Sequence, residues 1–550
     1  MNVRSFDWVV RTCLIFAAAG CSGGETPDPS GAGASAGTGS AGKSGGAGQT
    51  GSGGSSGSTA GSAGNLSSGG KAGGNSSGAG GAAGSLSAGS GGTQPAGSGG
   101  MAGTSAGTGG SAGSSAGGSG GETVGNCNFE IKGAVSKAIP TVGVVDWSVD
   151  LANLSEASIE FTLDDARADE LNKGSGGPID IAGTAHRALL LGMKAARTYT
   201  YRIVAKAGST VCTSGDQTIT TGALSSNLPA ITRTVAKADA IDPGFIITSA
   251  GIAMGGGGGG SAAQVAYIFD ADGDLVWWFN APASCSRALM NYEGTDMWML
   301  ELNVDNAGGE MRRVSMDGTD VEMNVTGLSK VHHDFTVLPG GIVAGPSWVS
   351  TGRDPPSDLI ERSPDGTIKT VVTIDEGIYQ SNTYHTNAIV YYPDTDTYTL
   401  GDRNPNAYVK ITRTGEVLWQ FGGNCSNAPA PKCASGTWQV NHGHQLLPNG
   451  NFVFFNNGSG AGGSTAYEYS LTESGTMLTA QMVWSYSAQG VSSMVLGDVQ
   501  RLPNGNTLVI YSNAGDIHEV DPEGELVQTF DTVSLGYANF RKTLYGPPLR

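Results

Sequence analysis

The chain has 550 residues, a formal net charge of −18 at pH 7 and 90 glycines, which are much denser before residue 125 than after it. Its basic residues are scattered singly rather than gathered in one run, which argues against a nucleic-acid partner. An acidic surface mainly confers solubility, so an anionic substrate would need a local positive site against the overall field.

Residues 1–20 are predicted to be a lipoprotein signal peptide, because Arg4 and Arg11 precede an apolar run that is too short to span a bilayer. The run ends at Ala18-Ala19-Gly20-Cys21, which resembles the lipobox of bacterial lipoproteins. We therefore expect lipidation at Cys21 and, with Ser22 after it, an exported protein of the periplasm or cell surface that is anchored in the outer membrane. The alternative is an ordinary secretory signal that is cleaved at a nearby small residue.

Residues 21–125 repeat Gly, Ser, Ala and Thr and contain almost no aromatic residues. Such a composition has too little apolar surface to bury against the entropy of ordering, so we expect a disordered Gly/Ser/Ala-rich tether. A flexible chain of about 100 residues has a root-mean-square span of roughly 50 to 60 Å. That span is enough to hold a domain clear of a membrane surface.

Residues 126–224 are predicted to form a small β-sandwich. Short β-rich segments separated by turn residues occur at 141–149, 157–163, 188–191, 199–205 and 217–221.

Outside the signal and the lipobox, five cysteines remain in a compartment that permits disulfides: Cys127, Cys212, Cys285, Cys425 and Cys433. This number suggests two pairs and one free thiol. Cys127 and Cys212 lie near the two ends of the predicted sandwich, and Cys425 with Cys433 could close a short loop. Cys285 is then expected to be a free, buried thiol.

Residues 225–550 are predicted to form a six-bladed β-propeller, because one strand, turn and strand pattern recurs six times in them. Each copy has a polar turn that ends in glycine, followed by a strand that is often aromatic. The turn glycines are 45 to 60 residues apart, at Gly273, Gly318, Gly366, Gly415, Gly475 and Gly524. A second hairpin recurs between them, at Leu338-Pro-Gly-Gly341, Leu447-Pro-Asn-Gly450 and Leu502-Pro-Asn-Gly505.

Two hairpins per period make four strands, which is the content of one propeller blade. Such a sheet can bury both of its faces only by stacking on its neighbours. A flat β-sandwich would not repeat the same turn six times, and no amphipathic helical stretch of useful length appears. The predicted fold class is therefore all-β, with a disordered tether, a small β-sandwich and a six-bladed β-propeller.

Two local patterns are not interpreted as binding motifs. Asp270-Ala-Asp-Gly-Asp274 begins like a calcium loop, but Ala281 stands where the closing glutamate should be, so we expect a hairpin turn. The glycines at 255–260 lack a following Gly-Lys-Ser/Thr and are predicted to form a loop rather than a phosphate cradle.

Propellers bind ligands where the loops that enter their inner strands converge. Five of the seven histidines fall at this level in three successive blades: His332, His333, His385, His442 and His444. A structural histidine bonded to a neighbouring strand is the simpler interpretation for any one of them. We expect that role for His332 or His444 and for the outlying His186 and His518. The prediction of a site depends on the set of His333, His385 and His442.

Three facing imidazoles suit zinc binding or acid, base and nucleophilic chemistry about equally. Arg403 follows His385 by 18 residues, at the expected end of the next strand of the same blade. A guanidinium there would repel a divalent cation and suits an oxyanion such as sulfate or phosphate. The sequence therefore favours an oxyanion site with no metal and no cofactor.

These residues resemble the bacterial arylsulfate sulfotransferases over roughly residues 225–545, and the preceding sandwich is similar to the N-terminal domain of that family. The resemblance rests on His332-His-Asp-Phe335, His385-Thr-Asn-Ala388, Asp402-Arg403, Asn441-His442, Phe455-Asn-Asn-Gly458 and the closing segment Gly536–Tyr545. The chain departs from the family pattern at Asn441, where Gln is expected, at Gly443, where a larger side chain is common, and in the glycine run at 255–260.

The resemblance implies transfer of a sulfuryl group from a phenolic sulfate ester to another phenol through a covalent sulfohistidine, without a nucleotide sulfate donor. His442 matches the nucleophile. His333, His385 and Arg403 match the residues that hold the sulfate oxygens and stabilise the leaving phenoxide. Cys425 and Cys433 match the disulfide of the family just ahead of the nucleophile, which would brace the loop that carries His442.

Two other functions stay open at this point. A catalytically silent propeller would bind a ligand or a protein partner, and a metal-dependent hydrolase or lyase would hold zinc on the same histidines. The expected partners are an aryl sulfate donor, a phenolic acceptor and the membrane through Cys21, with no nucleic acid. The sequence leaves a homodimer open.

Overall fold

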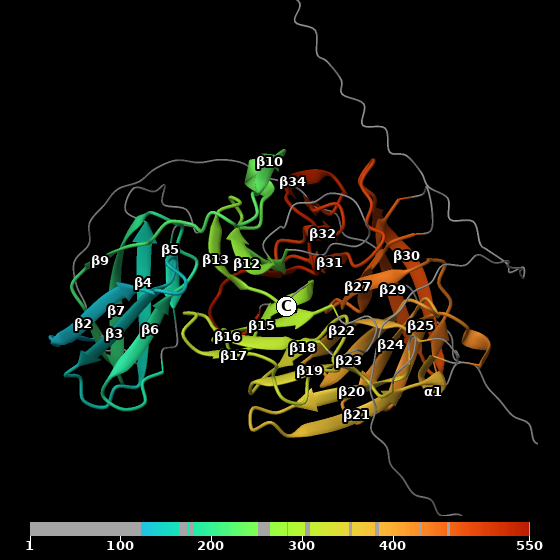
Figure 1. Ribbon diagram of the computed structural model, residues 1–550, viewed down its shortest axis with the longest axis horizontal. Coiled ribbons are helices and arrows are strands. Elements are labelled where there is room, and N and C mark those ends of the chain that lie inside the picture. Colours follow the sequence, from blue (N-terminus) through green and yellow to red (C-terminus); the bar gives the residue numbers. More distant parts are fainter. Residues whose placement is uncertain are drawn as a thin grey trace, which may run out of the picture. The chain divides into compact units, whose positions relative to one another are not determined.

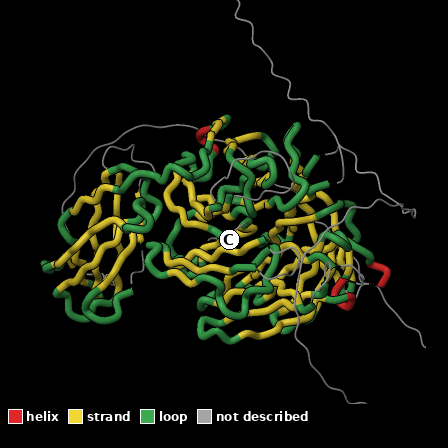
Figure 2. Tube along the Cα trace, viewed as in Figure 1, coloured by secondary structure: helices red, strands yellow, loops and turns green. Residues whose placement is uncertain are grey.

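The computed structural model describes residues 123–163, 173–176, 180–250, 264–282, 284–302, 309–350, 355–379, 384–427, 432–458 and 463–548. All of them belong to one compact unit, Ser111–Arg550. Strands dominate these residues, and the helical turns shown in Figure 2 are short: α1 (Glu376–Tyr379), η2 (Ala238–Ala240) and η3 (Cys425–Asn427). The prediction of an all-β chain is confirmed.

Several predictions fall on residues outside the described ranges. They are the signal peptide at 1–20, lipidation at Cys21, the tether up to residue 122 and the glycine loop at 255–260. Within the described ranges, none of the helices has the length and apolar character needed to cross a membrane.

The N-terminal part of the described chain consists of two sheets around one hydrophobic cluster. One sheet has the order β2-β3-β6, and the other has the order β1-β8-β7-β4-β5 with β9 paired to β7. Side chains along β4 alternate between the interior and the surface, and Val145, Ile159 and Ile203 are fully buried in the shared cluster. The two sheets occupy the segment predicted to be a sandwich, although the first strand begins at Thr123 rather than at residue 126. The strands are β1 (Thr123–Val124), β2 (Phe129–Val135), β3 (Gly143–Val149), β4 (Glu156–Leu163), β5 (Lys173–Gly176), β6 (His186–Leu190), β7 (Thr198–Ala207), β8 (Thr210–Thr213) and β9 (Gln217–Thr220).

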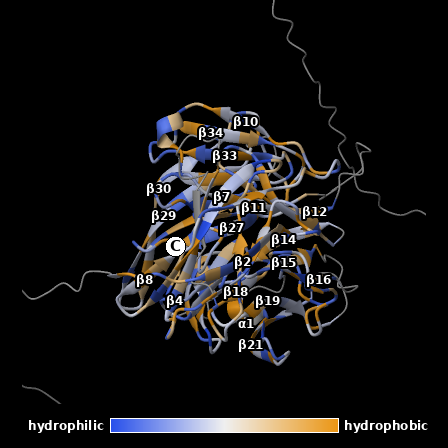
Figure 3. Ribbon diagram, turned by 90° about the vertical axis from the view of Figure 1, so that its left-hand side faces the viewer, coloured by the Kyte–Doolittle hydropathy of each residue, from blue (hydrophilic) through white to orange (hydrophobic). Residues whose placement is uncertain are grey.

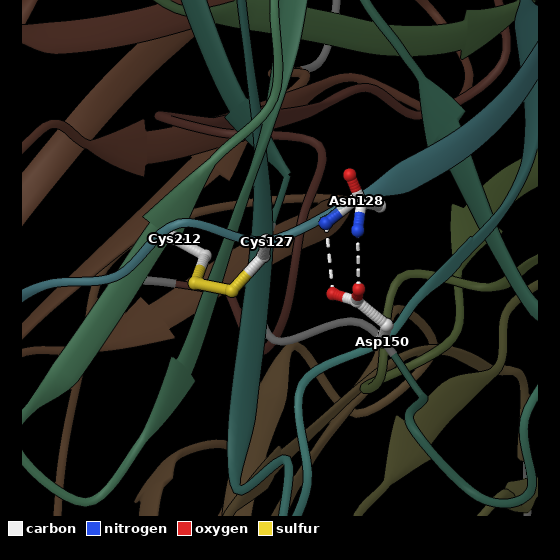
Figure 4. The surroundings of a disulfide bond; sticks show 4 residues. All are labelled: Cys127, Asn128, Asp150 and Cys212. Atoms are coloured by element: carbon white, nitrogen blue, oxygen red, sulfur yellow. Dashed lines mark hydrogen bonds between the residues drawn. A yellow bond between two sulfur atoms is a disulfide. The ribbon is translucent and has the colours of Figure 1, made fainter.

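A disulfide joins Cys127, just ahead of β2, to Cys212 in β8, with Cα atoms 5.9 Å apart. Beside it, the carboxylate of Asp150 accepts hydrogen bonds from the backbone N–H and the side-chain amide of Asn128, at 2.8 and 2.6 Å (Figure 4). These two links tie the chain ahead of β2 to β8 in one sheet and to the end of β3 in the other.

The second predicted disulfide, Cys425 to Cys433, is also present, with Cα atoms 5.5 Å apart. Cys285 is the free thiol among the described cysteines, and it is buried. The cysteine pairing predicted from the sequence is therefore confirmed.

The described residues after the N-terminal part form six sheets of four or five strands, and Figure 1 shows them succeeding one another through the green, yellow and red parts of the chain. A six-bladed propeller requires this number of sheets. From the innermost strand outward, the first sheet is β35 (Asn539–Arg541), β11 (Phe245–Ser249), β12 (Val265–Asp270) and β13 (Leu275–Asn280). The second is β14 (Cys285–Met290), β15 (Asp296–Glu301), β16 (Met311–Ser315) and β17 (Val321–Glu322). The third is β18 (Thr336–Leu338), β19 (Ile342–Trp348), β20 (Ser357–Arg362) and β21 (Ile368–Ile374).

The remaining three sheets follow the same order of strands. The fourth is β22 (Thr386–Tyr392), β23 (Thr397–Asp402), β24 (Ala407–Thr412), β25 (Val417–Gly422) and β26 (Cys433–Ala434). The fifth is β27 (Asn441–Leu446), β28 (Asn451–Asn456), β29 (Thr465–Ser474) and β30 (Met477–Tyr486). The sixth is β31 (Asp498–Arg501), β32 (Thr507–Tyr511), β33 (Asp516–Val520), β34 (Leu526–Asp531) and β10 (Thr232–Val235).

The repeated turn glycine is required by the conformation of the backbone. All six of the glycines that define the repeat have φ between 58° and 88°, a region that glycine adopts without a steric penalty. Each of these turns connects the third and fourth strands of its sheet. The repeat seen in the sequence therefore marks the outer hairpin of every sheet.

Strands from both ends of this segment complete the first and the sixth sheets. The C-terminal strand β35 pairs with β11, and β10 pairs with β34. These two sheets share one hydrophobic cluster, in which Tyr267 and Phe269 pack with Leu508 and Phe530. The ring of sheets thus cannot open without breaking one of these ladders and exposing this cluster.

Apolar side chains fill the spaces between successive sheets. Figure 3 shows hydrophobic and hydrophilic residues mixed along the same strands, as expected when the sheets stack on one another. Between the third and fourth sheets, for example, Leu359, Tyr398 and Val409 are fully buried in one cluster.

The acidic turn Asp270–Asp274 is a hairpin turn, as predicted. Its three carboxylates lie close enough together to hold a cation. However, the ammonium group of Lys194 lies 3.1, 2.8 and 2.8 Å from Asp270, Asp272 and Asp274. Lys194 belongs to the segment predicted to be a sandwich, so this ion-pair cluster links that segment to the first sheet of the ring.

Candidate active site

The six-sheet ring places the predicted site residues at one end of its sheets. His333 lies in the loop ahead of β18, His385 comes directly before β22, and His442 lies at the start of β27. Arg403 comes directly after β23. Because β22 and β23 are antiparallel, the start of one and the end of the other lie at the same edge of the sheet. All four residues are therefore found where inner strands begin.

His442 lies in a β-bulge. The pairing of β27 with β28 joins Asn441 to Asn456 and resumes only at His444 with Phe454. His442 and Gly443 are thus left out of the ladder, and a bulge of this kind redirects a side chain away from the regular alternation. The carbonyl of His442 instead accepts a hydrogen bond from the hydroxyl of Tyr408 at 3.2 Å.

Gly443 has no room for a side chain. A Cβ atom added there would lie 2.0 Å from a carboxylate oxygen of Asp498 and 2.8 Å from its Cα atom. This contact explains the departure from the family pattern at residue 443, because any larger residue would displace Asp498 and the inner strand β31.

Asn457 fixes the orientation of the His442 ring. Its side-chain oxygen lies 2.5 Å from His442 Nδ1. Its amide nitrogen donates to the carbonyls of Ser493 and Leu496, at 2.8 and 2.7 Å, so the oxygen must face the histidine. Nδ1 therefore carries the proton, and Nε2 presents its lone pair.

Asn457 belongs to Phe455-Asn-Asn-Gly458, one of the motifs that resemble the arylsulfate sulfotransferases, but the motif by itself implies no role for it. Its place follows the second strand of its sheet, just as Arg403 follows the second strand of the preceding sheet. That equivalence is the signal by which the sequence alone could have assigned it to the site.

The imidazole of His442 is neutral at physiological pH. It is only 3% exposed, and burial lowers its pKa to about 3, against the opposing hydrogen bond to Asn457. The positive charge of Arg403 and the neighbouring His333 lower this pKa further. Arg403 and His333 lie at the same end of their sheets as His442.

His333 contacts two other histidines. Its ring centroid lies 4.4 Å from that of His385, in an edge-to-face arrangement. The Nδ1 atoms of His332 and His333 lie 2.8 Å apart, so one donates a hydrogen bond to the other. The backbone of His333 has φ +59°, a conformation that is rare for a residue with a side chain and is concentrated at functional sites.

His332 itself is held by the third sheet. Its Nε2 is hydrogen-bonded to Ser357 Oγ at 2.7 Å, and its ring stacks on Trp348 with centroids 3.5 Å apart. Burial, and then the neighbouring His333 and His385, lower the pKa of His332 well below its usual value. His332 therefore braces His333 as a neutral ring.

His385 and Arg403 are positioned by one buried carboxylate. Asp402 accepts hydrogen bonds from the backbone N–H of His385, at 2.8 and 2.9 Å, and from the hydroxyl of Thr386 at 3.0 Å. The N–H of Arg403 donates to the carbonyl of His385 at 3.3 Å. Both side chains are half-buried, and Arg403 forms no ion pair with a carboxylate of the described residues. Its charge is therefore available to an anion.

Below the histidines, an ion cluster closes the axis of the ring. Arg287 pairs with Asp334 at 2.7 Å and with Asp498 at 2.9 Å, and its guanidinium lies 4.3 Å from the ring centroid of Tyr537. All four residues are buried. Burial raises the pKa of Asp498 to about 6, although Arg287 opposes the shift. No pattern in the sequence indicates this cluster, because its members come from four different sheets or loops.

The other histidines have structural contacts, as predicted for several of them. His444 Nε2 is hydrogen-bonded to Thr399 Oγ1 at 2.7 Å, and His518 Nδ1 to the hydroxyl of Tyr486 at 2.8 Å. His186 packs against Trp147, with ring centroids 4.5 Å apart. Among the described residues, no three histidine, cysteine or acidic ligand atoms gather within 4.8 Å at the histidine end of the ring.

Residues 367–532 match the family model of the arylsulfotransferases (ASST). This match confirms the resemblance that was inferred from the sequence, and it supports an arylsulfotransferase-type function in general. The matched segment contains His385, Arg403, His442 and the disulfide between Cys425 and Cys433, whereas His333 precedes it.

Comparisons with other proteins gave weaker similarities. No curated protein matches the chain. Among solved structures, virginiamycin B lyase from Staphylococcus aureus matches at 13% identity and a TM-score of 0.33, covering 54% of this chain and 88% of the other. The β-propeller domain of the Trilobed protease from Pyrococcus furiosus matches at 8% identity and a TM-score of 0.27, covering 76% of this chain and 99% of the other.

Proposed function

Since residues 367–532 carry an arylsulfotransferase-family domain, we propose that this chain transfers a sulfuryl group from an aryl sulfate ester to a phenol, with His442 as the nucleophile. The observation that carries the proposal is the arrangement around His442. A neutral ring with a fixed tautomer lies near an arginine that has no carboxylate partner among the described residues.

The first half of the reaction forms a sulfohistidine. Nε2 of His442 donates its lone pair to the sulfur of the donor, the bond between sulfur and the aryl oxygen breaks, and the phenoxide leaves. Nδ1 keeps its proton throughout, because the Asn457 oxygen accepts a hydrogen bond from the Nδ1–H group. The hydrogen bond strengthens as the ring gains positive charge, so Asn457 stabilises the intermediate more than the free enzyme.

The second half reverses the first with a new phenol. The oxygen of the acceptor bonds to sulfur as the bond from Nε2 to sulfur breaks, which restores the neutral imidazole. The acceptor loses one proton and the departed phenoxide takes one up, so protons balance over the full cycle. No nucleotide sulfate donor is required. Ping-pong kinetics follow from this sequence of steps.

Arg403, His333 and His385 are proposed to hold the sulfuryl oxygens and to stabilise the leaving phenoxide. A guanidinium can make two parallel hydrogen bonds to such a group. In the loose transition state of sulfuryl transfer, as in that of the analogous phosphoryl transfer, charge accumulates on the oxygens, and donors already in place stabilise it without reorganisation. The αL backbone of His333 and the carboxylate of Asp402 keep two of these groups in position.

The direct test is the intact mass of the protein after brief exposure to 4-nitrophenyl sulfate, with nitrophenol release followed by absorbance. One sulfuryl adduct per chain, lost on adding a phenol, is the expected result. A folded protein that gives neither adduct nor nitrophenol would instead support a propeller that only binds a ligand.

Replacing Asn457 with Ala is expected to lower kcat for 4-nitrophenyl sulfate by about 100-fold with little change in KM. The ring of His442 would lose the acceptor that fixes its tautomer, while the groups that bind the sulfate would remain. The matched control is Asn456→Ala, because the side chain of Asn456 bonds, among the described residues, to the backbone N–H groups of Gln439 and Gly458 and not to a histidine. Equal losses of kcat in the two variants, in protein of equal stability, would contradict this role.

The rate is expected to stay constant as the pH is lowered from 8 to 5. Burial lowers the pKa of His442 to about 3, so its neutral form persists over this range. For a histidine with the ordinary pKa of about 6.5, the neutral fraction would be about 30-fold smaller at pH 5 than at pH 8. The measurement is kcat/KM for 4-nitrophenyl sulfate against pH. A fall with a midpoint near 6.5 would show that the nucleophile has an unperturbed pKa.

We also propose that the chain is exported and held at the outer membrane by lipid on Cys21. The sequence Ala18-Ala19-Gly20-Cys21 supports this proposal, and the composition of residues 21–125 suits a long tether. Mass spectrometry of the N-terminal peptide from membranes tests it. A mature N-terminus at any residue other than a diacylated Cys21 would contradict lipidation.

A further inference from the structure

A cavity of about 470 Å³ lies at the end of the ring axis opposite to the histidines. The residues that line it follow the site residues along the same inner strands: Ile389 comes after His385, and His444 to Leu447 come after His442. Arg287 and Asp498 form part of its wall, so the ion cluster separates it from the candidate active site. A cavity of this size is typical of sites for small organic molecules.

Most of the wall is apolar. The side chains that matter most for a ligand come from five inner strands or their loops: Leu289, Phe335, Val337, Ile389, Leu447 and Val499. An apolar ligand of the size of a substituted benzene would bury its surface against them, at roughly 25 cal/mol for each Å² removed from water.

Two positive side chains in this wall form no ion pair with a carboxylate among the described residues. Arg541 is 2% exposed, and its guanidinium donates to the carbonyls of Asn291, Thr543 and Gly546 rather than to an acid. Lys410 is half-buried on β24, and burial lowers its pKa, although the negative charge of Glu473 opposes the shift. In contrast, the third cation of the wall, Arg287, is neutralised by two carboxylates.

The positive side chains of the wall indicate that the ligand of this cavity is an anion. Among the described residues, the acids in the wall are Asp498, which is paired to Arg287, and Asp394, which is exposed at the rim. Positive groups in a partly enclosed apolar cavity run against the net charge of −18. Uncompensated buried charge is costly unless a counter-ion accompanies it. We propose that this cavity is a second ligand site, separate from the histidine site, for a small organic anion with an aromatic or other apolar body.

The test is calorimetric titration of the full chain with 4-phenylbutyrate, 4-phenylbutan-1-ol and inorganic phosphate. We expect one 4-phenylbutyrate per chain, binding of the alcohol at least tenfold weaker, and no binding of phosphate. The variant Lys410→Gln should weaken 4-phenylbutyrate about tenfold, as expected for the loss of one charge contact. It should leave the affinity for the alcohol unchanged. The matched control is Lys369→Gln, on the exposed side of β21, which should change nothing.

A second variant guards against an effect of misfolding. Leu289 is only partly buried, so Leu289→Trp should fill the cavity without disturbing the core, and it should abolish binding of both aromatic probes. The proposal fails if folded wild-type protein binds no 4-phenylbutyrate, if the acid and the alcohol bind equally, or if binding survives Leu289→Trp. Binding that survives Leu289→Trp but is lost in Arg403→Gln would place the anion at the histidine site instead.

Discussion

A His442→Asn variant is expected to release no nitrophenol from 4-nitrophenyl sulfate above the uncatalysed rate and to form no sulfuryl adduct, a loss of at least about 10⁴-fold in kcat. Asparagine keeps a polar side chain next to Asn457 but lacks a lone pair that can attack sulfur. Because the ring is buried and neutral, its removal leaves no buried charge and should cost little stability.

The matched control is His518→Asn. This histidine is also held by one hydrogen bond, to Tyr486, but it lies in β33 of the sixth sheet rather than at the start of an inner strand. We expect the turnover of the His518→Asn variant to equal that of the wild type. If His442→Asn, folded by its thermal melt, still formed an adduct, the nucleophile would be another residue, and His333 would be the next to test.

The second large effect is expected at Arg287, where an Arg287→Met variant should lose about 3–5 kcal/mol in free energy of unfolding. The substitution leaves the carboxylates of Asp334 and Asp498 buried without their shared partner. Chemical denaturation of the full chain measures the loss. Activity should also fall, because Asp498 lies against Gly443, next to the proposed nucleophile.

The loss of unfolding free energy in Arg287→Met should increase as the pH rises. Burial already raises the pKa of Asp334 and Asp498, to about 6 for the latter, and removal of Arg287 would raise both further. A carboxyl with a raised pKa binds its proton in the folded state above the pKa of the unfolded chain, so stability falls as the pH rises. The deficit of Arg287→Met should therefore be larger at pH 7 than at pH 5.

The matched control is Arg313→Met, which removes an arginine paired with Asp296 and Asp320 in a more exposed position. Partly exposed ion pairs contribute about 1 kcal/mol or less. Similar losses for the two arginines, or a deficit for Arg287→Met that grows as the pH falls, would show that the buried cluster is not a set of ionised partners.

Gly443 and Asn457 show how much of the candidate site could be predicted. The sequence identified His333, His385, Arg403 and His442, because each stands at a matching place in a repeated unit. It noted Gly443 only as a departure from the family pattern. The cause of this departure is that a side chain at residue 443 would collide with Asp498, which is 55 residues away in the sequence. A repeat predicts positions within one sheet, whereas contacts between sheets depend on how the sheets pack.

By itself, the sequence determined the all-β class, the repeated outer hairpin with its left-handed glycine, the two disulfides and the level at which the histidines gather. Turn conformation and strand alternation are properties of a few neighbouring residues, and the cysteine pairing followed from the number and positions of the cysteines along the chain. Only the tertiary structure decided the pairing of β35 with β11 and of β10 with β34, the tautomer of His442, the ion cluster on the axis and the cavity beyond it. Each of these features depends on residues that are not neighbours in the sequence, and their free energy arises from burial that exists only when the ring is closed.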